Sequence, residues 1–239
     1  MPTDAGGRVP RWRLGDDPRP LARLLRRGGV VAIPTGSSYG LAADPHSAEG
    51  VERIYRLKER ERGKPLPLVV ADLEQVAALG LDPAAPELAA AARLWPAPLT
   101  VVSPLRAGFG SPPAAAGGTT LAVRVPAHEP LRAVLHALGF GLTATSANLS
   151  GEPPLVDALA VEELLARLES ESLVGASLGG DGSPLGSANV ALVEGPLGGH
   201  REPSTVVAWN SARGGFDVLR PGRVTAEHIL TTAEPDLKR

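Results

Sequence analysis

The chain has 239 residues and no cysteine, which excludes disulfides, thiolate catalysis and cysteine-ligated zinc or iron–sulfur sites. Aromatic residues make up only 3 %, so valine, leucine, alanine and isoleucine must fill the core, for which an apolar share of 43 % is sufficient. There is no apolar run of about 18 residues, and the N-terminal stretch lacks the apolar segment of a signal peptide. These absences predict a soluble cytoplasmic protein with no membrane partner.

A surplus of positive charge is also missing. The net charge is −2 and the isoelectric point is about 6.2, which argues against binding a polyanion over the whole surface and leaves room for a local basic groove. The five histidines show no H-x-x-x-H or H-x-H spacing, so the sequence predicts no protein metal site.

The order of apolar and amphipathic segments predicts an α/β fold with a mixed sheet. Helices and strands alternate first, and three strands then follow in succession. The predicted helices are 21–29, 47–58 (capped by Ser47), 72–79, 86–94, 129–139 and 156–170. The predicted strands are 30–33, 65–71, 99–105, 120–126, 141–147, 187–194, 203–209 and 216–222. We expect one domain over residues 19–230, a loosely ordered segment 1–18 and a tail 231–239.

The stretch "PTGSSYGL" (residues 34–41) follows the predicted buried strand 30–33. It carries many hydroxyl groups but matches neither the phosphate-binding G-x-x-x-x-G-K-[ST] loop nor the G-x-S-x-G nucleophile turn. The segment is therefore interpreted as a loop that helps to frame a substrate pocket.

A row of charges occupies "KERERGKPL" (residues 58–66). One interpretation is a solvated helix end with alternating charges. The other is an extended segment, favoured by Gly63 and Pro65, in which Lys58, Arg60, Arg62 and Lys64 share one face. Such a row of cations could bind a triphosphate.

Two further segments offer polar groups at strand ends. The loop "TATSANLSGEPP" (143–154) follows a predicted strand, so Ser146 and Asn148 could present a hydroxyl and an amide to a phosphate or ribose, although both residues are also common in ordinary turns. Arg124 in "LAVRVP" alternates with Val123 and Val125, which places it on a solvated face or against a carboxylate. The segments "PST" (203–205) and "LRPG" (219–222) each have a simple turn explanation.

In this order the segments resemble the Sua5/YrdC/YwlC family, the L-threonylcarbamoyladenylate synthases of tRNA modification. The resemblance covers about residues 28–222, and its most specific part is the combination of K-x-R (Lys58, Arg60) with S-x-N (Ser146, Asn148). It implies the short, single-domain form with a YrdC-like fold, in which a twisted mixed sheet is flanked by helices and leaves an open concave face.

The resemblance also implies the reaction and its partners. Threonine is carboxylated by bicarbonate or CO2, the carbamate attacks the α-phosphate of ATP, and threonylcarbamoyl-AMP and pyrophosphate form. A downstream transferase complex then modifies adenosine 37 of tRNA. Mg²⁺ is expected on the phosphates without a dedicated protein site.

The site residues follow from the same resemblance, on motifs of this chain. Four are expected to be catalytic: Lys58, Arg60, Ser146 and Asn148. ATP is expected to bind to these four together with Lys64 and Arg220. Threonine is expected to bind to Thr35, Tyr39, Arg124, Thr145 and Ser204.

One position departs from the family pattern P-T-[DE]-T-x-Y-G-L, because Gly36 stands where an acidic residue is usual and Ser37 follows it. This departure keeps open a YciO-like paralogue with altered or weak activity, or one that removes the threonylcarbamoyl group or transfers another carbamoyl group. A further alternative is a module that binds double-stranded RNA or tRNA, since the resemblance implies a concave face and the cations at 58–64 permit a local basic patch.

Overall fold

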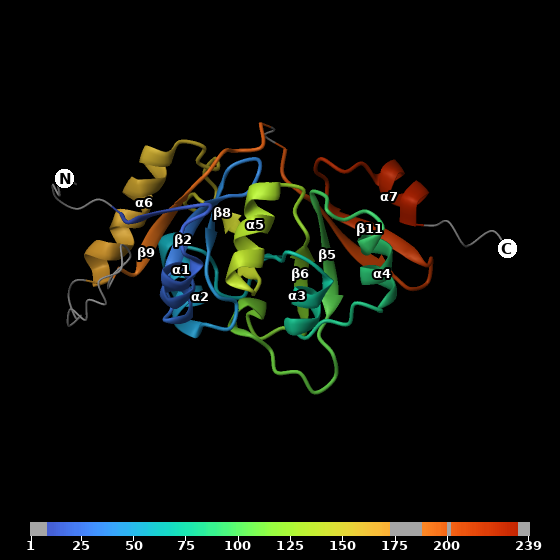
Figure 1. Ribbon diagram of the computed structural model, residues 1–239. Helices are drawn as coiled ribbons and strands as arrows, with labels where there is room; N and C mark the ends of the chain where they lie inside the picture. The colour runs from blue at the N-terminus through green and yellow to red at the C-terminus, as the bar shows by residue number, and fades with distance from the viewer. Residues whose placement is uncertain (1–8, 173–187, 200–201, 234–239) are drawn as a thin grey trace.

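The computed structural model describes residues 9–172, 188–199 and 202–233. Two mixed sheets lie side by side, each with its own helices (Figure 1). The predicted α/β class is confirmed, with two mixed sheets where the sequence suggested one.

The five-stranded sheet has the order β1-β9-β2-β3-β8. Its strands are β1 (Arg11–Arg13), β9 (Val190–Glu194), β2 (Val30–Pro34), β3 (Tyr39–Ala42) and β8 (Thr145–Ser146). The nearby helices are α1 (Pro18–Arg26), α2 (Ala48–Leu57) and α6 (Ala158–Ser172).

The six-stranded sheet has the order β11-β10-β5-β6-β4-β7. Its strands are β11 (Gly215–Arg220), β10 (Thr205–Asn210), β5 (Leu99–Pro104), β6 (Thr120–Arg124), β4 (Leu68–Val69) and β7 (Leu142–Thr143). The nearby helices are α3 (Leu73–Ala78), α4 (Pro86–Ala92) and α7 (Ala226–Ala233), with a 3₁₀ turn at Pro113–Ala115; α5 (Glu129–Leu138) lies in front, between the two sheets (Figure 1).

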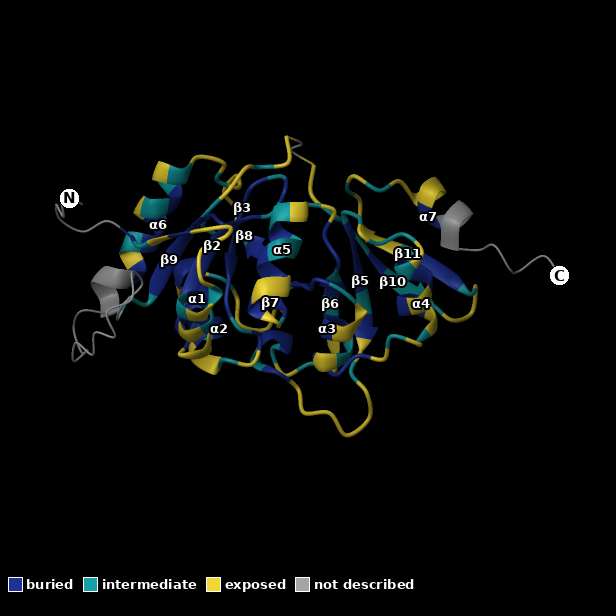
Figure 2. Cartoon of the chain, viewed as in Figure 1, coloured by how far each residue is buried: buried dark blue, intermediate teal, exposed yellow. Residues whose placement is uncertain are grey.

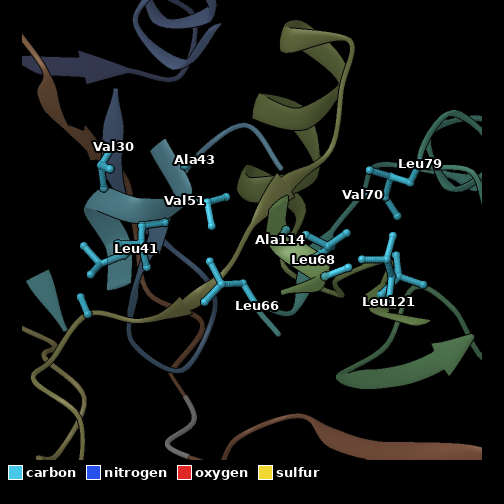
Figure 3. Close-up of a cluster of buried hydrophobic side chains, with 14 of the residues drawn as sticks. Val30, Leu41, Ala43, Val51, Leu66, Leu68, Val70, Leu79, Ala114 and Leu121 are labelled. Atoms are coloured by element: carbon cyan, nitrogen blue, oxygen red, sulfur yellow. The ribbon is translucent and has the colours of Figure 1, made fainter. Parts of the chain in front are cut away.

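Strand β2 is the middle strand of the five-stranded sheet. All five of its residues are buried, and the first four alternate between two core clusters. Val30 and Ala32 face the large cluster in Figure 3, whereas Val31 and Ile33 pack with apolar residues of α1 and α5. The side-chain period of two therefore gives this strand two apolar faces, each covered by helices. Figure 2 shows the same pattern, with buried strands and exposed outer helix faces.

Several sequence expectations need correction. Residues 11–13 form β1 within the segment expected to be loosely ordered, because buried Trp12 and the ion pair between Arg11 and Glu194 attach it to β9. The predicted tail begins inside α7, which runs to Ala233. The predicted strand 141–147 divides at Ala144 into β7, which pairs with β4, and β8, which pairs with β3. At this residue the chain passes from one sheet to the other.

Candidate active site

A cavity of about 850 Å³ lies where the two sheets meet. Thr145 and Ser146 come to its wall from β8, and Ala122 and Arg124 come from β6 of the other sheet. The chain crosses between the sheets at Ala144, which also lines the cavity. The site is therefore assembled from strands that belong to different sheets.

The stretch "PTGSSYGL" forms a hairpin in which β2 and β3 pair and only a short turn remains as a loop. Ser38 closes the turn, since its carbonyl oxygen accepts from the Thr35 amide and from Thr35 Oγ1, both at 2.9 Å. Gly36 is at the first position of the turn with φ +108°. A positive φ at that position is typical of the two-residue hairpin turns that begin with glycine. The turn places the side chains of Thr35, Ser37 and Ser38 along the cavity.

We expect Gly36→Asp to lower the free energy of unfolding by about 1–2 kcal/mol, because a side chain is strained at this positive φ. Urea denaturation measures the change. Gly63→Asp is the matched control, since its added Cβ would meet no atom within 4 Å and no positive φ is required there. Equal stability of the two variants would contradict the strained turn.

The prediction of an extended row of cations at 58–64 is wrong. Lys58 ends α2 in a helical conformation, and Glu59 then turns the chain with φ +49°. Lys58 is consequently buried, whereas Arg62 pairs with Glu52 and Lys64 pairs with Glu61 at the surface. Of the four cations, Arg60 is the one that lines the cavity, where its guanidinium donates to the carbonyls of Lys64 and Pro65.

The ammonium of Lys58 holds the loop that follows β8. Its Nζ donates to Ser146 O at 2.5 Å, Asn148 Oδ1 at 2.6 Å and Asn148 O at 2.9 Å. These three acceptors use all three N–H bonds of the ammonium group. Burial, together with the charge of Arg60, lowers the pKa of Lys58 to about 8.

The side chain of Asn148 completes this network. It is buried, and its Oδ1 also accepts from Ser146 Oγ at 2.7 Å while Nδ2 donates to Glu152 O. The backbone amide of Ser150 returns a hydrogen bond to Lys58 O at 2.9 Å. The loop thus packs around Lys58, and it leaves Ser146 at the cavity wall.

Arg124 is a cation of the cavity wall whose guanidinium the described part of the chain leaves without a partner. Its guanidinium has no hydrogen-bond acceptor and no ion-pair partner among the residues that the structure describes. Burial and the nearby charge of Arg220 lower the pKa of Arg124 to about 10, so it remains a cation near neutral pH. A half-buried, unpaired cation at a cavity wall attracts an anionic group. The predicted alternation along the strand is confirmed, since Leu121 and Val123 face the core.

Arg220 enters the same cavity from the end of β11. Its guanidinium donates to Ser204 O at 2.7 Å and to Ser204 Oγ at 3.2 Å. Ser204 Oγ also lies 2.9 Å from the hydroxyl of Thr100 on β5. Arg220 is thereby held near Arg124 although both are cations.

Seven of the predicted site residues share the cavity. They are Thr35, Arg60, Arg124, Thr145, Ser146, Ser204 and Arg220. Four others do not line it. Lys58, Asn148 and Tyr39 are buried behind the wall, and Lys64 lies at the surface.

Sequence reasoning missed other parts of the wall. Thr100 looks like an ordinary strand residue, so nothing local marks it, whereas Pro153 and Pro154 end the loop 143–154, of which only Ser146, Asn148 and Thr145 were assigned a role. Ser37 and Ser38 could have been found, because they belong to the hydroxyl-rich stretch that the analysis singled out.

Neither a metal cluster nor a membrane-spanning segment is apparent in the described ranges. Within residues 9–172, 188–199 and 202–233, no three histidine or carboxylate side chains gather as metal ligands. No helix in the same ranges has the length and apolar character needed to cross a membrane.

A family model and a curated relative both relate the chain to the same family. The family model Sua5_yciO_yrdC, described as "Telomere recombination", matches residues 23–176. The threonylcarbamoyl-AMP synthase of Thiobacillus denitrificans is 38 % identical over 189 residues, which cover 78 % of this chain and 88 % of the relative.

Solved structures resemble the model over most of its length. P. abyssi Sua5 complexed with L-threonine has a TM-score of 0.72 at 28 % identity, and the match covers 94 % of this chain but 60 % of the archaeal protein. The present chain therefore spans less than two thirds of that relative. E. coli YciO matches with a TM-score of 0.68 at 21 % identity over 92 % of this chain and 99 % of YciO, a likeness of fold alone.

Proposed function

Because the chain belongs to the Sua5/YciO/YrdC family, we propose that it synthesises threonylcarbamoyl-AMP from L-threonine, bicarbonate or CO2, and ATP. The threonine amine is carboxylated, a carbamate oxygen attacks the α-phosphorus of ATP, and the bond to the pyrophosphate leaving group breaks. The observation that carries the proposal is the cavity wall itself, which sets Arg124, whose guanidinium has no partner among the described residues, beside Arg220 and in the same cavity as Ser146 and Arg60.

In this proposal the positive groups divide between the two substrates. Arg124 binds the threonine carboxylate through a bidentate pair, with the hydroxyls of Thr35, Thr145 and Ser204 around the amino acid. Arg60, Arg220 and Ser146 contact the nucleotide. Fixed charges of this kind stabilise the charge that develops on the phosphates, and no covalent intermediate on the protein is needed.

The remaining predicted site residues do not line the cavity in the structure. Lys58 and Asn148 hold the loop that carries Ser146, so we assign them a positioning role. Tyr39 supports the wall through backbone hydrogen bonds to Leu155 and Ala147. Lys64 would have to leave Glu61 before it could reach a phosphate. Mg²⁺ carried by the phosphates, tRNA and a transferase complex belong to the proposal as partners.

The alternative of a nucleic-acid-binding module loses its main support. That alternative depended on a surface row of cations at 58–64. Lys58 is buried, and Arg62 and Lys64 are each paired with a glutamate. The threonylcarbamoyl-AMP synthase relative at 38 % identity favours the synthase over a YciO-like paralogue, whose likeness is one of fold.

The proposal is tested with purified protein, ATP, L-threonine and bicarbonate. We expect pyrophosphate and threonylcarbamoyl-AMP in equal amounts, and neither product when threonine or bicarbonate is left out. Ser146→Ala should lower turnover by about 10²-fold if its hydroxyl contacts a reacting phosphate. ATP consumption that does not depend on threonine would overturn the assignment.

A further inference from the structure

The guanidinium of Arg60 is held at the cavity by neutral acceptors. Its Nε donates to Lys64 O at 3.3 Å, and its Nη2 donates to Pro65 O at 3.0 Å. A guanidinium has five N–H groups, so these two contacts leave three for a ligand. Because both acceptors are peptide carbonyls and not carboxylates, they fix the guanidinium without cancelling its charge.

The next two cations along the chain are held in a different way. Arg62 pairs with Glu52, and the ammonium of Lys64 pairs with Glu61 at 2.9 Å. Arg60, in contrast, has no ion-pair partner in the part of the chain that the structure describes. It is therefore the cation of residues 60–64 whose charge remains available to an anion.

Tyr55 attaches the two carbonyls that hold Arg60 to the end of helix α2. This tyrosine is 5 % exposed, and its hydroxyl donates to Lys64 O at 2.7 Å. Its backbone carbonyl accepts from the Arg60 amide at 2.9 Å. Tyr55 thus contacts the backbone of Arg60 directly and its guanidinium through the shared acceptor Lys64 O. Burial raises the pKa of Tyr55, so the hydroxyl keeps the proton that it donates.

This arrangement orders the arginine before any ligand arrives. A free arginine side chain samples many rotamers and loses that freedom when it binds a phosphate. In this chain the loss occurs on folding, which favours tighter binding. Without the Tyr55 hydroxyl, Lys64 O loses its link to α2, and the adjacent Pro65 O is released with it. The guanidinium of Arg60 would then lack a fixed support.

We propose that Tyr55 is a positioning residue, which fixes the backbone of residues 64–65 so that Arg60 presents its three remaining N–H groups to the phosphates of ATP. The inference rests on the proposed function for the identity of that anion. Tyr55 does not line the cavity, so direct contact with a substrate would not explain its effect. If Tyr55 only stabilised the fold, its effect on ATP binding would not depend on Arg60.

The first test compares Tyr55→Phe with the wild type by calorimetry and steady-state kinetics. Phenylalanine keeps the buried ring and removes the hydroxyl alone. We expect ATP to bind about fivefold more weakly and KM for ATP to rise by a similar factor, with threonine binding unchanged. Ser111→Ala is the matched control, because it removes a hydroxyl that donates to Gly118 O in a loop away from the cavity wall. Wild-type ATP affinity in Tyr55→Phe would overturn the inference.

A second background separates positioning from simple stabilisation. Arg60→Lys keeps a cation but lacks the planar fork that contacts both carbonyls. Adding Tyr55→Phe to this variant should therefore weaken ATP binding by less than about twofold. A loss as large as in the wild-type background would show that Tyr55 acts independently of Arg60 and would refute the positioning role.

NMR signals of arginine Nε–H groups give a readout that needs no ligand. The Arg60 signal is identified by its absence from the spectrum of Arg60→Lys. We expect this group to exchange with water at least about tenfold faster in Tyr55→Phe, and at the wild-type rate in Ser111→Ala. Unaltered exchange overturns the inference even if the protein makes threonylcarbamoyl-AMP. Faster exchange in a protein that makes no such product refutes the synthase and leaves the role of Tyr55 standing.

Discussion

Replacing Arg124 with leucine is expected to abolish threonine binding while making the protein more stable. The half-buried guanidinium has no acceptor among the described residues, so the wild-type chain bears the desolvation cost of an unpaired cation beside Arg220. Leucine removes that cost and should raise the free energy of unfolding by about 1 kcal/mol. The lost charge-assisted pair should lower kcat/KM for threonine by roughly a hundredfold or more.

The two effects are measured separately. Calorimetry reports threonine and ATP binding, and urea denaturation reports stability. Arg56→Leu is the matched control, because Arg56 is exposed on α2 and away from the cavity wall, so neither quantity should change appreciably. Threonine binding that survives in Arg124→Leu would contradict the assigned carboxylate contact, whatever happens to stability.

Replacing Lys58 with methionine should weaken ATP binding by about tenfold or more without removing any group from the cavity wall. Methionine removes the Lys58 donor from three acceptors on Ser146 and Asn148, of which Asn148 Oδ1 keeps the hydrogen bond from Ser146 Oγ, so the loop after β8 should open. Hydrogen exchange of residues 146–152 should accelerate, whereas exchange in β2 should not change. Threonine binding, which depends on Arg124, should be less affected than ATP binding.

The pH dependence gives an independent measurement of the same contact. Above pH about 8 the Lys58 ammonium loses a proton and one of its three donated hydrogen bonds, so ATP affinity of the wild type should fall between pH 7 and 9.5. Stability should move the other way. The pKa of Lys58 is lower in the folded protein than its ordinary value of 10.5, so the unfolded chain binds more protons between pH 8 and 10.5. The free energy of unfolding should therefore rise with pH across that window.

Lys58→Met should lack both trends, with ATP affinity that is low and flat across the same range. Lys58→Arg keeps a cation and should recover part of the ATP affinity without the step near pH 8. A wild-type step that persists in the methionine variant would assign it to another group and would contradict the role of Lys58.

Features set by local signals could be predicted from the sequence. Ser47 caps α2 because its hydroxyl oxygen accepts a hydrogen bond from the Gly50 amide, as the predicted N-cap requires. Gly139 ends α5 with φ +76°, the left-handed conformation that glycine favours. The all-apolar run 30–33 is a strand buried on both faces.

Features set by distant partners could not be predicted in this way. Residues 11–13 form a strand only because β9 pairs with them. Strand β3 was not predicted, because the turn that joins it to β2 is so short that residues 34–41 look like one continuous loop. The prediction of an extended row of cations at 58–64 was wrong for a related reason. Alternating charges suggest an extended segment with its cations on one face. Lys58 is instead helical, and its ammonium is buried because it donates to oxygens of Ser146 and Asn148, 88 and 90 residues away in the chain. Motifs in the sequence were sufficient to name the site residues. Only the fold shows which of them line the cavity and which, such as Lys58 and Asn148, lie buried behind its wall.

The position of β9 has a consequence for the order of events during synthesis. Residues 190–194 form the strand that separates β1 from β2, so the first sheet lacks an inner member until most of the chain has left the ribosome. Nascent chains shorter than this point expose the apolar edge of β2, which is a hazard for aggregation. The first sheet should therefore close late during translation, and the cavity wall is completed only afterwards, when Ser204 and Arg220 have also emerged.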